Sequence, residues 1–247
     1  MSVIRRIGMA SQKGKRAKRR AARKRQLIWA SVLAVLVATW GVVYLISIST
    51  GGPAGALASG TSKERLAAIT QLLNVGTHGS AAVLAEYCLD EDEQIAVRCT
   101  DALGRLAFLE HEATLAKVLK DRRPNIRAAA VVAIGRYGRK EADHQLVMAS
   151  FRQDKMPQVR AAAAKVFGRN LLWDAMPDLV NGLRDDSVEV RTHSFESVSK
   201  ILGVRFKYYP SASPESREPV VKTIEKYYSG FEKQHASYIE RLEETGQ

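Results

Sequence analysis

The chain has 247 residues, of which 46% are apolar, and a formal net charge of +12. The apolar fraction is sufficient to build a core and excludes a disordered chain. Spread evenly, the positive charge would suggest nucleic-acid binding, but eleven of the 38 Lys and Arg residues lie within residues 1–26. Because the rest of the chain holds 27 basic and 26 acidic residues, the strong basicity belongs to this tail alone.

Residues 1–26 are predicted to form a basic cytoplasmic tail, since they contain no acidic side chain. Such a tail could bind RNA or DNA as a flexible arm, or it could contact anionic lipid headgroups. No aromatic residue stands among the basic ones to stack on bases, and the tail directly precedes an apolar stretch. We therefore expect lipid contact and no nucleic acid, with nucleic-acid binding through the tail as an alternative.

Residues 27–48 are predicted to form one transmembrane helix, because they run for twenty-two residues without a charge. As a helix they would reach about 33 Å, enough to cross a hydrocarbon core of about 30 Å. A buried core helix of this length would normally show a polar face. Eleven basic residues precede the stretch, against Lys63 and Arg65 soon after it, so the N-terminus is expected in the cytoplasm and the rest outside.

A cleaved secretory signal is the alternative, because the sequence AGALASG at residues 54–60 offers a small-residue site ending at Ala58. Cleavable apolar regions are usually about 7 to 15 residues long, and this one is longer, so we favour an uncleaved signal anchor. The chain has no Asn-x-Ser/Thr sequon, which is compatible with a bacterial source. We expect a single-pass protein of the bacterial cytoplasmic membrane, with its folded part extracytoplasmic.

Residues 49–60 are rich in Gly, Pro, Ala and Ser and are predicted to be a flexible linker, after which residues 61–202 repeat with a period of about 31. Five equivalent positions carry arginine or, once, alanine: Arg65, Ala96, Arg127, Arg160 and Arg191. An aspartate stands six residues before each of the last four: Asp90, Asp121, Asp154 and Asp185. Eight residues after the five positions come Leu73, Gly104, Gly135, Gly168 and Ser199.

Each unit is predicted to form two helices, for example residues 124–138 and 142–153. Alanines keep the first helix slim, and the glycine removes a side chain where two helices would collide and helps the helix stop. The arginine is expected to reach the aspartate of its own or an adjacent inter-repeat turn. Such a partly exposed pair contributes about 1 kcal/mol, so apolar stacking should dominate stability. This structural, non-catalytic ladder comprises Asp121, Arg127, Asp154, Arg160, Asp185 and Arg191.

This pattern resembles HEAT repeats in their short bacterial form, also called PBS-lyase HEAT-like repeats. The matching stretches are DEDEQIAVRCTDALGRL, DRRPNIRAAAVVAIGRY, DKMPQVRAAAAKVFGRN and DDSVEVRTHSFESVSKI. The resemblance implies an all-α fold, a right-handed α-α superhelix of about five helix pairs, here preceded by the transmembrane helix. Ala96 and Ser199 depart from the pattern, and the first unit keeps only Arg65 and its apolar spacing.

Residues 203–247 break the period and are predicted to form a capping loop and helix. Ser213 followed by Pro214 is a helix start, and apolar residues then recur on one helical face. Segments of this kind close some bacterial HEAT-repeat proteins. The alternative is an aromatic recognition surface made of Tyr208, Tyr209, Tyr227, Tyr228 and Tyr238.

The residues that could carry chemistry are few. Cys88 and Cys99 are expected to be buried small side chains, with a disulfide between them as the alternative. His111 and His144 occupy equivalent positions in consecutive units and could lie near one another, but two histidines do not make a metal site. No phosphate loop or nucleophile elbow is present, so we expect no cofactor, no metal and no catalysis.

The sequence therefore predicts a membrane-anchored HEAT-repeat scaffold that binds an unknown protein partner through its concave face. Exposed second-helix positions that vary between units are the candidate partner-binding residues. They are Lys117, Lys120, Gln145, Met148, Arg152, Asn181 and Arg184. A lyase-related enzyme is the alternative that fold analogy leaves open, although the repeats carry over no catalytic residue.

Overall fold

The computed structural model describes residues 52–137 and 141–245, with side chains described for residues 52–136 and 141–231. These residues form eleven α-helices and two short 3-10 helices and contain no strand, which confirms the all-α class. None of the helices in these ranges is long and apolar enough to cross a membrane. The predicted tail, residues 1–26, and the predicted transmembrane helix, residues 27–48, lie outside the described residues.

The chain divides into two units, residues 1–59 and residues 60–247. In the first unit, the described residues form helix α2, Pro53–Ser59, where the sequence predicted a flexible linker. Three alanines favour a helix, and proline is well tolerated in the first helical turn, where its missing N–H has no intrahelical partner. The predicted linker, residues 49–60, is therefore corrected to a helix over most of its described part.

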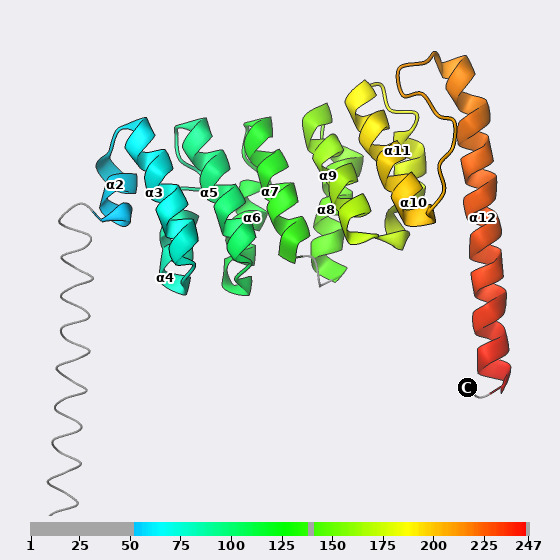
Figure 1. Cartoon of the computed structure of the whole chain (residues 1–247), viewed down its shortest axis with the longest axis horizontal. Coiled ribbons are helices and arrows are strands. Elements are labelled where there is room, and N and C mark those ends of the chain that lie inside the picture. The colour runs from blue at the N-terminus through cyan, green and yellow to red at the C-terminus, as the bar shows by residue number, and fades with distance from the viewer. Residues whose placement is uncertain (1–51, 138–140, 246–247) are drawn as a thin grey trace, which may run out of the picture. The chain divides into compact units, whose positions relative to one another are not determined.

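The second unit begins with four helix pairs, as Figure 1 shows. The first helices of the pairs are α3 (Ser62–Val75), α5 (Glu93–Leu106), α7 (Pro124–Tyr137) and α9 (Pro157–Asn170). Their second helices are α4 (His78–Glu86), α6 (Glu112–Val118, after the 3-10 turn η1, Leu109–His111), α8 (Glu141–Gln153) and α10 (Met176–Gly182, after η2, Trp173–Ala175). The fifth unit has the first helix α11 (Val188–Leu202), but residues 203–213 then lead to α12 (Pro214–Thr245) in place of a short second helix.

Consecutive first helices pack directly on one another, and glycines set how closely they approach. A Cβ added at Gly104 would lie 2.5 Å from Cα of Ala133 on the next first helix, and one at Gly135 would lie 2.4 Å from Val166 Cγ1. One at Gly168 would lie 2.3 Å from Ser197 Oγ. The prediction that these glycines prevent a collision between helices is therefore confirmed at three successive contacts between first helices.

The predicted second role of these glycines, helping the helix stop, is wrong. Helices α5 and α9 continue two residues beyond their glycine, to Leu106 and Asn170, and are capped by Ala107 and Leu171. Both capping residues adopt the left-handed conformation, with φ of 53° and 52°. The glycine therefore serves helix packing, while a residue with a Cβ takes the strained conformation that ends the helix.

The C-terminal segment covers part of the last repeat. Tyr208 is buried, donates a 2.5 Å hydrogen bond to the Leu183 carbonyl and lies 5.0 Å from the ring of Phe195. Trp173 of η2 contacts the rings of Tyr228 and Phe231 on α12 at 5.4 and 5.1 Å. These contacts agree with a cap.

The tyrosines of the segment do not form one aromatic surface. Tyr208 faces the interior, whereas Tyr209 is 67% exposed and Tyr227 is 42% exposed. Tyr228 is half-buried, and the side chain of Tyr238 lies outside the described residues. The alternative reading as a recognition surface is therefore limited to Tyr209 and Tyr227.

Candidate functional site

Arg127 forms a clamp between two successive inter-repeat turns. Its Nε and Nη2 donate to the two carboxylate oxygens of Asp154 at 2.7 and 2.8 Å. Its Nη1 donates to the backbone carbonyls of Asp121 and Arg122 at 2.9 and 3.0 Å. One guanidinium therefore holds the carboxylate of the following turn and two carbonyls of its own turn.

The next unit repeats this geometry. Arg160 donates to both oxygens of Asp185 at 2.9 Å, and its Nη1 donates to the carbonyls of Asp154 and Lys155 at 2.9 and 3.1 Å. In the first unit, Arg65 pairs with Asp90 through two hydrogen bonds. Arg65, Arg127 and Arg160 thus reach the aspartate of the adjacent turn, and for Arg127 and Arg160 their own turn contributes backbone carbonyls.

Arg123 supplies the clamp in the unit that has Ala96 in place of arginine. Its Nε and Nη2 donate to the carboxylate of Asp121 at 3.0 and 2.9 Å, and its Nη1 donates to the carbonyls of Asp90 and Glu91 at 2.7 and 3.1 Å. The acceptors correspond, repeat for repeat, to those of Arg127. Arg123 was not among the predicted residues because it comes from the following turn, 27 positions after Ala96.

Arg191 ends the series with a neutral acceptor. Its Nη1 donates to the carbonyls of Asp185 and Asp186 at 2.6 and 2.9 Å, as in the other clamps. Its Nε donates to the carbonyl of Pro210 at 2.6 Å, in the place where the earlier clamps have a carboxylate. The capping segment thereby replaces the turn of a further repeat.

The clamps are more enclosed than the sequence suggested. The side chains of Arg127 and Asp154 are 15% and 12% exposed. Burial acts to raise the pKa of Asp154, but hydrogen bonds from Arg127 and from the Met156 N–H outweigh it and hold this pKa below its ordinary value. A pair this enclosed, with two further carbonyls satisfied, is worth more than the expected surface value of about 1 kcal/mol.

The predicted partner-binding residues lie on α6, α8 and α10 or directly after them. Lys117, Lys120, Gln145 and Asn181 are exposed, and the side-chain amide of Gln145 donates a 2.6 Å hydrogen bond to the carboxylate of Glu141 within α8. Met148 is only 4% exposed, because it shares the buried side of α8 with Val147 and Phe151. Including Met148 in a partner-binding face is therefore wrong.

The two predicted arginines are exposed but engaged. Arg152 donates to both carboxylate oxygens of Asp178, at 2.8 and 2.9 Å. Arg184 holds Glu218 and Glu225 of α12, each through a contact of 2.7 Å, and therefore anchors the capping helix. Arg152, Arg184 and Asn181 line a cavity of about 370 Å³, which is also lined by the Arg160–Asp185 pair.

The described residues include no group of three or more His, Cys, Asp and Glu that could hold a metal ion. Cys88 and Cys99 are buried and free, and burial raises the pKa of both thiols, that of Cys88 to about 11. His111 lies 3.5 Å from the carboxylate of Glu110, which also binds His78 at 2.9 Å.

Comparison with protein families matches residues 81–155 to HEAT repeats. The match and the all-helical fold support a HEAT-repeat protein. The matched stretch runs from within α4 to just past α8, so it contains the Arg123 and Arg127 clamps. The remaining HEAT-like units are supported by the same helix pairing and the same hydrogen-bond pattern. A search of curated proteins gave no match.

Proposed function

We propose that the chain is a single-pass, membrane-anchored HEAT-repeat scaffold that binds another protein and does not catalyse a reaction. HEAT repeats suggest a protein-interaction role. The observation that carries the proposal is the series of exposed polar side chains on consecutive second helices, beside a core and a clamp series that are internally satisfied. A solenoid offers an extended partner many such positions at once.

Four positions make up the proposed contact face: Lys117, Lys120, Gln145 and Asn181. Lys117 and Lys120 are exposed and form no ion pair with a described residue, so both can meet an acidic partner. Arg152 and Arg184 contribute less, because each already neutralises a carboxylate. Charges that are free before binding add attraction without first breaking an existing pair.

The membrane anchor rests on the sequence alone. The uncharged stretch at residues 27–48 is long enough to cross a bilayer, and the basic residues before it favour a cytoplasmic N-terminus. The repeats would then lie outside the cytoplasm, in a bacterial cytoplasmic membrane protein. Protease protection of the full chain in spheroplasts tests this topology: cleavage of the repeats from outside is expected, and full protection would contradict it.

Photo-crosslinking tests the contact face. A photoreactive amino acid is placed at Gln145 in the full chain in its native membrane, and as a control at Lys165, which is exposed on the first helix α9. Adducts are expected from position 145 and not from position 165. The double substitution Lys117→Glu and Lys120→Glu should remove the adducts while the far-UV circular dichroism is unchanged. Equal adducts at both positions, or adducts unaffected by charge reversal, would refute the choice of face.

A further inference from the structure

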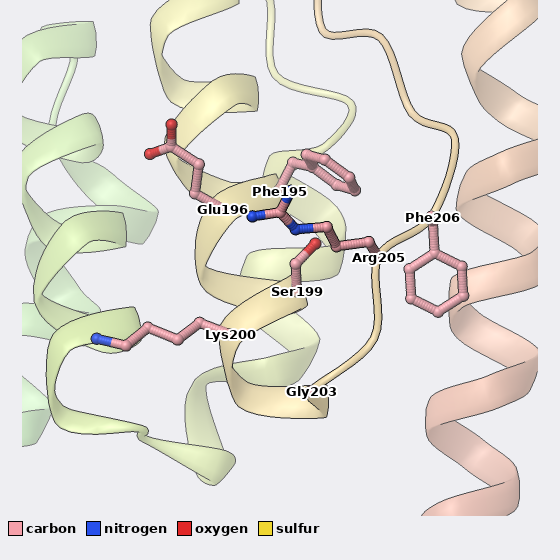
Figure 2. A pocket seen from close by; sticks show the side chains of 7 residues that line it. All are labelled: Phe195, Glu196, Ser199, Lys200, Gly203, Arg205 and Phe206. Atoms are coloured by element: carbon pink, nitrogen blue, oxygen red, sulfur yellow. The ribbon is translucent and has the colours of Figure 1, made fainter.

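A hollow of about 630 Å³ lies at the C-terminal end of the row of first helices. It lies between α11 and the segment that follows α11, as Figure 2 shows. Phe195 and Ser199 of α11 line it, together with Arg205 and Phe206 of the segment. The arginine side chain extends from the segment back toward α11 in this view.

The position of the hollow in the repeat indicates a surface suited to polypeptide. By the repeat period, Ser199 is equivalent to Gly168, Gly135 and Gly104. Each of those glycines is covered by the next first helix, but α11 has no following first helix. Tyr208 of the capping segment covers part of this face by packing on Phe195, and the hollow is the part left open.

Two serine hydroxyls of α11 differ in their hydrogen bonding, and the one at the hollow has no partner among the described residues. Ser197 Oγ donates a 2.7 Å hydrogen bond to the Ala164 carbonyl of the preceding first helix. Ser199 Oγ is enclosed and has no hydrogen-bond partner among the described residues. A buried polar group without a partner is costly, so an incoming carbonyl or carboxylate oxygen would be favoured there.

The charge at the hollow is positive. Arg205 is exposed, and no hydrogen bond or ion pair to a described residue is found for it. Glu196 is the acidic residue of the lining, but its carboxylate binds His193 at 2.9 Å and points away from Arg205 in Figure 2. Lys200 adds a second positive charge at the rim. The lining therefore favours an anion rather than a cation.

The apolar lining continues onto α12. The ring of Phe206 lies 5.7 Å from that of Tyr227, and Tyr227 with Lys226 and Phe231 lines a second hollow of about 410 Å³. Phenyl rings, an enclosed hydroxyl and free cations thus occur along one path. A small inorganic anion would use only the cations, whereas a peptide can use all three.

We propose that this end of the solenoid binds an acidic peptide segment of a partner protein, with a carboxylate on Arg205, a backbone or carboxylate oxygen on Ser199, and an aromatic or aliphatic side chain between Phe195 and Phe206. The inference rests on the proposed scaffold function, but it concerns a surface separate from the second-helix face. It assigns the chemistry of the bound segment, which the repeats alone do not.

Selection of randomised peptides on phage against the detergent-solubilised full chain tests the proposal. Recovered peptides should be rich in Asp and Glu around a Phe, Tyr, Trp or Leu. Fluorescence anisotropy with the most frequent peptide should show binding weakened about tenfold or more by Arg205→Glu, since loss of a charge-assisted hydrogen bond exceeds a factor of ten in affinity. Ser199→Ala should weaken it about threefold to tenfold. The matched control Arg98→Glu, at an exposed arginine of α5, should leave binding unchanged.

Failure to recover any peptide, recovery of peptides that are not acidic, or binding that Arg205→Glu leaves intact overturns the proposal. A second variant set separates this outcome from failure of the scaffold function. Lys117→Glu with Lys120→Glu should abolish partner crosslinking at Gln145 while peptide binding persists. If the double variant loses peptide binding and Arg205→Glu retains it, the peptide binds the second-helix face and not the hollow.

Discussion

Replacing Arg127 by methionine tests the clamp, because methionine keeps an apolar stem of similar length and loses every donor. Four hydrogen bonds disappear: two to Asp154 and two to the carbonyls of Asp121 and Arg122. The Asp154 side chain is 12% exposed in the intact pair, and the N–H of Met156 is a second donor to it at 2.9 Å. Removing one partner of a buried ion pair costs about 3 to 5 kcal/mol, and the remaining donor favours the lower end, so we expect about 3 kcal/mol.

Urea unfolding of the full chain in detergent, followed by far-UV circular dichroism, measures this loss. Arg122→Met is the matched control, because the adjacent side chain is exposed and should change stability by less than about 0.5 kcal/mol. A loss for Arg127→Met that equals that of the control would refute the reasoning, since the clamp would then be a surface pair of little value.

The same variant has a pH signature. In the folded chain the pKa of Asp154 is held below its ordinary value, so its stabilisation is present above the unfolded-state pKa of about 3.9 and is lost as pH falls through the lower folded-state pKa. The stability difference between wild type and Arg127→Met should therefore be full at neutral pH and shrink below about pH 4. A difference that stays constant to pH 2 would exclude the carboxylate as the source.

Three further sets of variants test the packing of the repeats by the same unfolding measurement. Arg123→Ala should cost about 2 kcal/mol, and adding Ala96→Arg should recover more than half of it by restoring the guanidinium from the regular position; no recovery would contradict the equivalence. Gly104→Ala should cost more than Gly135→Ala, because the new methyl group meets the backbone of Ala133 2.5 Å away in the first case and only side-chain atoms of Val166 in the second. Ala107→Gly should raise stability by about 0.5 to 1 kcal/mol by relieving the positive φ, and a decrease would refute this strain.

The helix pairs could be predicted from sequence because their signals are local and periodic. Pro124 and Pro157 begin first helices, and the alanine-rich stretches after them carry the spacing of a helix. The burial of Met148 was also available from the sequence, because Val147 and Phe151 lie on the same side of a helix and share its apolar character. Met148 was placed on the partner face because its position varies between repeats, although the apolar pattern of its own helix predicts that it is buried.

Other features depend on contacts that no local pattern contains. Arg123 was missed because its role requires that it lie beside Asp90, 33 residues earlier in the preceding turn, and the equivalent position in the arginine series is an alanine. The helix ends at Ala107 and Leu171 lack the usual glycine signal, so the sequence pointed to the wrong residues. The hollow at Ser199 depends on how far the capping segment covers α11, which only the fold determines.

Arg191 binds the Pro210 carbonyl where the earlier arginines bind a carboxylate. This difference adds positive charge at the end of the solenoid. In earlier units each guanidinium is neutralised by an aspartate, whereas the described contacts of Arg191 are all to carbonyls. Arg191, Phe195 and Ser199 are spaced by four residues along α11, so they lie along one side of this helix. The buried charge of Arg191 therefore adds to the positive potential already set by Arg205, and it does so through a low-dielectric interior where screening by salt is weak. An acidic ligand at this end would be attracted by a charge that the solenoid carries because its stack of repeats ends there.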